Sequence, residues 1–219
     1  DDSIVLSEAG NYTNFYATTT ITAVDSDVID VTVSTNQANK IHFTKPFNNS
    51  LYIFTKYAQY ELVSEGTFSS SNVSISNATN YPMNTGVEPI VVNDSLYFIS
   101  TTNNRQQLRE YIKTEKLNVK GIDLNISTPT YLTEPIKRIV VDGVLGYVVC
   151  TTDTDTVYLY NYKEDGESRI QTSWSKWKFF NGLTTAANSF QYFSLSSNLL
   201  VWCKTTLDYR YHKLQLDYN

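Results

Sequence analysis

One short motif recurs four times along this chain and restricts what the chain can fold into. Each copy is an apolar run, a turn of Asn, Asp, Ser or Gly, a leucine and a second apolar run. Turn-forming residues between runs of β-branched and aromatic residues are typical of a β-hairpin. We therefore expect a fold of repeated hairpins, whose leucines are Leu51, Leu96, Leu145 and Leu199.

A third apolar run follows each hairpin, so the repeat is at least three strands long. The four leucines are 45, 49 and 54 residues apart, a period typical of blade-type β repeats such as propellers. We predict an all-β, propeller-like array of three- to four-stranded antiparallel blades, about four repeat units that form part of a larger propeller. The units lie near residues 41–63, 87–112, 136–162 and 190–216, within one propeller-like domain of residues 1–219 or a fragment of a larger subunit.

The repeat also makes local predictions. The four leucines should be buried at equivalent positions, and Asp142-Gly143 should form a tight two-residue turn that needs a glycine. Outside the repeat, residues 18–33 alternate as in another hairpin, with a short helix after Asp27 as the alternative. Val73 and Ile75 mark either the fourth strand of a unit or a strand that passes to the next unit.

Composition and charge narrow the functional classes. With 17 Tyr, 10 Phe and 3 Trp in 219 residues, the chain has ample material for a packed core. Its net charge of −5 argues against a protein that grips nucleic acid, because that requires a basic face. No signal peptide, lipidation motif or long apolar run is present. The chain begins Asp1-Asp2 without an initiator Met, so we expect it to be an excised or proteolysed part of a longer protein.

The sequence offers little material for catalysis. The histidines are His42 and His212, each in an expected strand and outside any recognisable motif, and no phosphate-binding glycine loop occurs. Turn formation explains the acidic pairs Asp25/Asp27 and Asp153/Asp155 better than cation binding does. The cysteines, Cys150 and Cys203, are expected to be small buried apolar residues. We predict no catalytic, cofactor-binding or metal-binding residue.

Two surface features have alternative interpretations. Six Asn-x-Ser/Thr triplets are potential glycan acceptors in a secreted protein, but a chain rich in Asn, Ser and Thr produces such triplets by chance. The aromatic cluster Trp174, Trp177, Phe179 and Phe180 is either a carbohydrate-stacking platform or part of the packing between blades. We favour packing.

Several stretches resemble the central region of tail tubular protein B, or nozzle protein, of short-tailed phages. The resemblance begins with residues 26–36, 41–55 and 59–62, and continues in the same order with 108–111, 123–131 and 169–177. The last stretch is similar to the Gln-Ser/Thr-x-Trp-x-x-Trp pattern of that family, its most specific signature. The resemblance covers roughly residues 26–180. The structural and family signature residues are, taken together, Gln171, Ser173, Trp174, Trp177, Pro46 and the four leucines of the repeat.

This resemblance implies a non-enzymatic structural protein of the virion tail that has no cofactor and no membrane anchor. The expected partners are further copies of the chain in a hexameric ring, the adaptor protein (tail tubular protein A) and the tail fibres. Genomic DNA is expected to pass through the lumen without tight binding, and a net acidic chain fits that role because it repels phosphate. Two alternatives are a propeller-type binding module for a surface glycan or protein, and a glycoside-cleaving enzyme that uses two facing carboxyl groups.

Overall fold

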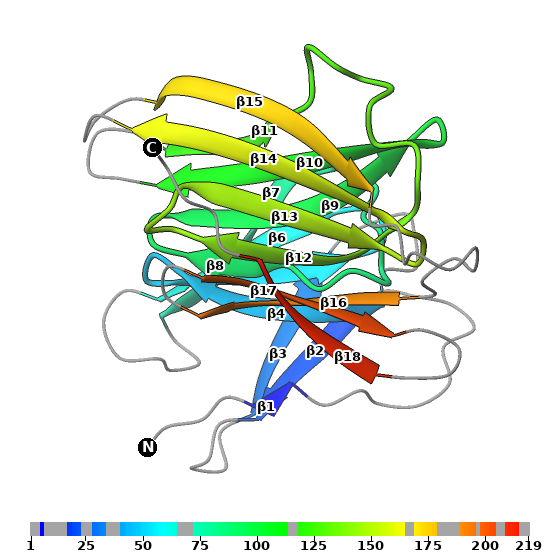
Figure 1. Ribbon diagram of the computed structural model, residues 1–219. Helices are drawn as coiled ribbons and strands as arrows, with labels where there is room; N and C mark the ends of the chain where they lie inside the picture. The colour runs from blue at the N-terminus through cyan, green and yellow to red at the C-terminus, as the bar shows by residue number, and fades with distance from the viewer. Residues whose placement is uncertain are drawn as a thin grey trace. The chain divides into compact units, whose positions relative to one another are not determined.

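The computed structural model of the chain describes residues 5–6, 17–22, 28–33, 40–64, 72–113, 118–164, 169–178, 189–195, 198–204 and 209–214. The regular elements within these residues are all β-strands (Figure 1). This confirms the predicted all-β class, and in residues 28–33 it shows strand rather than the alternative helix. None of the described residues belongs to a helix long and apolar enough to cross a membrane.

The described strands form five antiparallel sheets. The sheet nearest the N-terminus contains β1 (Val5–Leu6), β2 (Ala17–Thr22) and β3 (Val28–Val33). The next contains β4 (Ile41–Phe47), β5 (Ser50–Thr55), β6 (Gln59–Ser64) and β7 (Val73–Thr79). It is followed by β8 (Ile90–Val92), β9 (Ser95–Thr102), β10 (Arg105–Lys113) and β11 (Asn118–Asp123). The fourth sheet contains β12 (Ile136–Asp142), β13 (Tyr147–Thr152), β14 (Thr156–Glu164) and β15 (Arg169–Lys178), and the last contains β16 (Ser189–Leu195), β17 (Asn198–Lys204) and β18 (Tyr209–Leu214).

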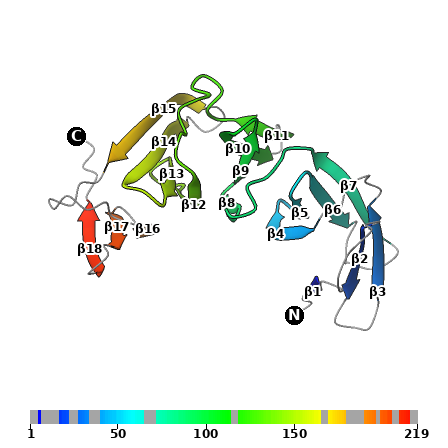
Figure 2. The same ribbon diagram turned by 90° about the vertical axis from the view of Figure 1, so that its right-hand side faces the viewer.

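Each of the four predicted repeat units contains three consecutive strands of one sheet. In the three four-stranded sheets, hydrogen-bonded neighbours are also neighbours in the sequence. Figure 2 shows the strands of each of these sheets following one another in chain order. Val73 and Ile75 lie in β7, the fourth strand of its sheet and not a strand that passes to the next unit. The chain divides into two compact units, residues 1–85 and residues 86–219. Within the second unit, β12 contacts both β8 and β16.

Asparagine-rich turns close the first two hairpins of the repeat. Phe47 pairs with Ser50 across Asn48-Asn49, and both asparagines have positive φ, 49° and 60°. Asn93 has φ 52° in the turn after β8. Asparagine accepts the left-handed conformation at low cost, and two such residues make the turn that matches strand twist. The predicted hairpins at these two sites are confirmed.

The third hairpin corrects the sequence prediction. Asp142 is paired with Tyr147, so residues 143–146 form a four-residue loop in place of the predicted two-residue turn. The Asp142 carboxylate accepts hydrogen bonds from the backbone NH groups of Val144 (2.9 Å) and Leu145 (3.0 Å), which favours the wider loop. Gly146, with φ 69°, takes the left-handed position that was predicted for Gly143.

The longer loop also changes the alignment of the repeat. Leu96 is fully buried, whereas Leu51 is half-buried at the equivalent position of its sheet. Leu145 lies half-buried in the loop. The second position of the strand, which Leu51 and Leu96 occupy in their sheets, is taken in β13 by Val148, which is fully buried. The prediction of four buried, equivalent leucines is therefore wrong for Leu51 and for Leu145. The side chain of Leu199 lies outside the described residues.

A described hydrophobic core lies within each compact unit. The larger described core belongs to the second unit and combines Val87, Tyr97, Ile99, Leu108, Leu132, Ile136, Ile139, Val141, Val148, Cys150, Tyr158 and Tyr160. A smaller core in the first unit contains Ile53, Ala58, Tyr60 and Leu62. Burial of the Cys150 side chain, as predicted, raises the pKa of its thiol to about 12. The side chain of Cys203 lies outside the described residues.

The different burial of Leu96 and Leu51 predicts different costs of truncation. Leu96→Ala is expected to lower the free energy of unfolding by about 3 kcal/mol, because it leaves a cavity at a fully buried position. Leu51→Ala should cost about half as much, since water already reaches its half-buried side chain. Urea denaturation of the two variants measures both costs. A loss of unfolding free energy at Leu51 as large as that at Leu96 would contradict the different burial of the two side chains.

Candidate functional site

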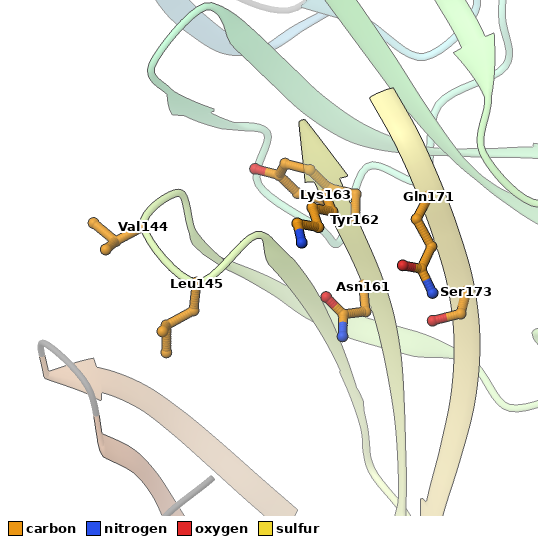
Figure 3. Close-up of a pocket in the computed structure, with 7 residues that line it drawn as sticks. All are labelled: Val144, Leu145, Asn161, Tyr162, Lys163, Gln171 and Ser173. Atoms are coloured by element: carbon orange, nitrogen blue, oxygen red, sulfur yellow. The ribbon is translucent and has the colours of Figure 1, made fainter. Parts of the chain in front are cut away.

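The most specific part of the family-like sequence lies on β15, an edge strand. Gln171 and Ser173 are exposed, and they pair with Lys163 and Asn161 of β14. Together with Tyr162 and the turn residues Val144 and Leu145, these four side chains line an open pocket of about 450 Å³ (Figure 3). Among the described residues, this lining contains no carboxylate, histidine or thiol.

Trp174 of the same strand is a packing residue. Its indole Nε1 donates a hydrogen bond to the backbone oxygen of Leu124 (3.0 Å). Its ring lies 5.1 Å from that of Tyr160 and 6.1 Å from that of Tyr131, measured between centroids. Trp174 therefore joins β15 to the loop that follows β11. These contacts agree with the packing interpretation, and they occupy the indole that a carbohydrate platform would need.

The 12-residue connection between β11 and β12 is fixed at several points by side chains. Gln106 donates to the backbone oxygen of Glu134 (2.7 Å) and accepts from the backbone NH of Ile136 (2.8 Å). The Tyr158 hydroxyl accepts from the backbone NH groups of Thr133 (3.1 Å) and Glu134 (3.0 Å). Polar groups that are paired in this way hold a loop in one conformation.

Asn125 closes the other end of this connection. Its side-chain oxygen accepts from the backbone NH of Leu108 (2.9 Å), and its amide donates to the backbone oxygen of Gln106 (3.2 Å). Because Asn125 is fully buried, it is no glycan acceptor in the folded chain, although it begins one of the six sequence triplets.

A buried ion pair connects the sheet β8–β11 with the sheet β12–β15. Both oxygens of the Glu110 carboxylate on β10 accept hydrogen bonds from Arg169 at the start of β15, at 2.6 and 2.8 Å. The Glu110 side chain is fully buried and that of Arg169 is 15% exposed. Ser95 donates a further hydrogen bond to Glu110 (2.8 Å). A two-point contact of this kind fixes direction as well as distance.

Aromatic rings surround the arginine. The guanidinium carbon of Arg169 lies 4.3 Å from the ring centroid of Tyr162 and 5.9 Å from that of Tyr160, a cation–π arrangement. Burial by itself lowers the pKa of Arg169, but the hydrogen bonds and the charge of Glu110 outweigh burial and raise it. Burial also raises the pKa of Tyr97 well above its ordinary value, and the Glu110 carboxylate adds to the rise.

The raised pKa of Tyr97 predicts a loss of stability in alkali. Above about pH 10 the unfolded chain releases the phenol proton that the folded chain retains. Stability from such a group is complete below its unfolded pKa and is lost as the pH rises further, by about 1.4 kcal/mol per pH unit. Tyr97→Phe should reduce the slope of unfolding free energy against pH by that amount. Equal slopes for both proteins above about pH 10 would contradict this assignment.

The predicted signature residues belong to both compact units. Gln171 and Ser173 share the pocket, Trp174 and Trp177 are half-buried on the same strand, and Pro46 is exposed on β4 in the other compact unit. Phe179 and Phe180 lie outside the described residues, as does the side chain of His212. Nothing in the sequence indicated that Glu110 and Arg169 form an ion pair, although each lies in one of the stretches that resemble the family.

The described residues hold no group of three or more His, Cys, Asp or Glu side chains placed to bind a metal ion. Asp153, one of the predicted turn carboxylates, forms an exposed ion pair with Lys137 (2.8 Å). His42 lies half-buried in β4. Within the described part of the chain, the buried ion pair and Trp174 connect neighbouring sheets. The reactive side chains there are not assembled into one site.

The sequence is similar to a known protein family and to a curated protein. The family model described as "Bacteriophage nozzle protein" matches residues 1–219. Among curated proteins, "Tail tubular protein gp12" of Escherichia phage T7 is 27% identical over 204 residues. The match covers 91% of this chain and 25% of that relative, so the chain spans about a quarter of the relative's length. Both matches extend beyond residues 26–180.

Proposed function

We propose, since the chain belongs to the bacteriophage nozzle protein family, that it is part of a structural subunit of a phage tail, located in the tail of the virion. The family inferred from the sequence resemblance is confirmed. The observation that carries the functional proposal is the family match over residues 1–219, together with the similarity to a tail tubular protein. The proposed role is mechanical, and it requires no catalytic group.

The arrangement of the sheets supports a propeller-like architecture for this part of the subunit. Each four-stranded antiparallel sheet follows the chain from its first to its fourth strand. In the second compact unit, the first strand of one sheet, β12, contacts the first strands of the sheets before and after it. Consecutive blades of a propeller meet in this way. We infer that residues 1–219 contribute blades of a larger propeller.

The proposed partners follow from a role as a conduit. They are further copies in a ring of six, the adaptor protein above the ring and the tail fibres beside it. DNA leaves through the lumen without tight binding, and the net charge of −5 favours this because an acidic chain does not neutralise phosphates. A closed ring of identical subunits requires contacts between two different faces of each subunit.

The test is the mass of the assembly formed by the full-length protein that contains this chain. Light scattering after size-exclusion chromatography, with and without the adaptor protein, should show closed rings of about six subunits in at least one condition. A strictly monomeric full-length protein in both conditions would overturn the ring. The isolated 219-residue chain, measured beside it, shows whether this part of the protein supplies the ring contacts.

A further inference from the structure

The edge of β15 that faces away from β14 has no pairing partner among the described residues. Residues 171–178 pair with β14 in one register without a bulge. β7 and β11, the last strands of the other two four-stranded sheets, have seven and six residues, whereas β15 has ten. The pairing of β11 is also interrupted by a register shift. Of these three strands, β15 therefore offers the longest regular edge to a further strand.

The first half of β15 lacks the features that usually keep an edge strand unpaired. Such strands carry charged side chains, a proline or a bulge along the free edge. Lys176 and Lys178 lie near the end of β15, but residues 170–173 are uncharged and exposed, and none of them is a proline. Ile170 among them is 56% exposed. This stretch is open to backbone pairing with another strand.

The pocket beside β15 lies against the same stretch. Its two residues from β15, Gln171 and Ser173, pair across the ladder with its residues from β14, Lys163 and Asn161. Residues two apart on a strand share a face, so these four side chains point to one side of the sheet. Figure 3 shows them and the Val144–Leu145 loop around one open space. The four side chains form no hydrogen bond or ion pair with other described residues, so their polar groups are available to a ligand.

The lining is complementary to a carboxylate on a short apolar stem. Lys163 is the charged residue among the described lining residues, and the two amides and the hydroxyl supply further donors. Val144, which is 95% exposed, and the half-buried Leu145 form an apolar wall. A glutamate side chain matches both parts, because two CH2 groups carry its carboxylate. The charge and the shape of the pocket thus favour glutamate.

A glutamate on a strand beside β15 can reach Lys163. Neighbouring strands lie about 4.8 Å apart, so the added strand is two such spacings from β14. The long lysine and glutamate side chains span this gap together. A sugar fits the lining less well, because its described aromatic residue, Tyr162, already contacts the guanidinium of Arg169 at 4.3 Å.

We propose that the first half of β15 is a docking edge for an extended peptide segment that carries a glutamate. The segment adds a fifth strand to the sheet β12–β15 through backbone hydrogen bonds, and its glutamate enters the pocket and binds Lys163. In this mode of recognition the backbone bonds supply affinity and the pocket supplies specificity. The docking edge goes beyond the proposed role in the tail, and its test does not depend on the number of subunits in the ring.

Fluorescence anisotropy measures the binding of a labelled peptide to the full-length protein that contains this chain. The probe is fluorescein-labelled Thr-Val-Thr-Glu-Thr-Val-Thr amide, and the matched peptide carries glutamine in place of glutamate. The glutamate peptide is expected to bind about tenfold more tightly, because a hydrogen bond between two charged groups is stronger than one to a neutral amide. Equal affinity for both peptides, or no binding because another copy already covers β15, would overturn the proposal.

Charge reversal on two lysines separates the pocket from general electrostatic attraction. Lys163→Glu should weaken binding of the glutamate peptide about tenfold and strengthen binding of a peptide with lysine at that place. Lys178→Glu makes the same change at an exposed position on the other face of β15, and should change the affinity less than about twofold. Both side chains are exposed, so neither change disturbs a core. Equal effects of the two substitutions would reject the pocket.

N-methylated peptides test the backbone pairing. Successive NH groups of a strand point to opposite edges, so only one alternate set of NH groups in the peptide faces β15. Methylation of that set should abolish binding, and methylation of the other set should leave it within about threefold. Retention of binding by both methylated peptides would show that the segment does not pair as a strand. Displacement of the glutamate peptide by maltohexaose, a neutral oligosaccharide, would identify a sugar site instead and would also overturn the proposal.

Discussion

Replacing Arg169 with methionine is expected to lower the free energy of unfolding by about 3–5 kcal/mol. The substitution leaves the Glu110 carboxylate fully buried with Ser95 as its remaining described hydrogen-bond donor. An uncompensated buried charge is far more costly than the loss of the attraction itself. Urea denaturation followed by tryptophan fluorescence measures the effect, because Trp174 lies in the same sheet junction.

Two further variants test whether burial is the cause. Glu110→Leu combined with Arg169→Met removes both charges and should recover most of the loss, since an apolar pair of similar volume often replaces a buried ion pair without cost. Lys137→Met breaks the exposed pair with Asp153, whose side chains are 52% and 60% exposed, and should cost less than about 1 kcal/mol. Equal losses for Lys137→Met and Arg169→Met would contradict the account.

Gly146→Ala is expected to lower the free energy of unfolding by about 3–5 kcal/mol, because it adds both backbone strain and a steric clash. Gly146 has φ 69°, a conformation that residues with a Cβ rarely adopt. An added Cβ would also overlap the backbone oxygen of Tyr162. That oxygen cannot move easily, because Gly146 accepts a hydrogen bond from the backbone NH of Tyr162 (2.7 Å).

Gly143 in the same loop provides the matched control. Its φ is not positive, and an added Cβ would meet side-chain atoms, Asn93 Nδ2 at 2.5 Å and Val92 Cγ1 at 2.9 Å. The Asn93 side chain ends in an exposed turn and can rotate away. Gly143→Ala should therefore cost only about 1–2 kcal/mol. Thermal denaturation ranks the two variants, and a larger loss for Gly143→Ala would show that the loop is described wrongly.

The strands of the repeat could be predicted because their signals are local. A turn such as Asn48-Asn49 and the apolar alternation on both sides of it lie within one short window of sequence. The fourth strands were harder to predict. β7 carries polar residues at Ser74, Ser76 and Asn77, which are exposed. This pattern fits an outer strand and a connecting segment equally well.

The error at Leu145 has a physical cause. The turn residue Asp142 caps two backbone NH groups and lengthens the loop to four residues, which moves the first residue of the next strand to Tyr147. Asp followed by Gly is compatible with a two-residue turn and with a four-residue loop. The sequence therefore did not determine the register in which the two strands of this hairpin pair. One misplaced turn was enough to shift the alignment of the repeat.

The ion pair between the sheets could not be predicted from the sequence. Glu110 and Arg169 are 59 residues apart, and neither stands in a local pattern that indicates a partner. Trp174 was recognised as part of the family signature, but its hydrogen bond to Leu124 depends on the conformation of the connection after β11. Contacts of this kind follow from how one sheet meets the next, which strand periodicity does not specify.

The most direct test of the tail assignment is a cryo-electron microscopy map of the virion that contains the full-length protein. We expect the sheets β4–β7, β8–β11 and β12–β15 to fit density in the tail, in six copies around the channel below the portal and adaptor. Density for these sheets at another place in the virion, or a complete tail without it, would contradict the assignment.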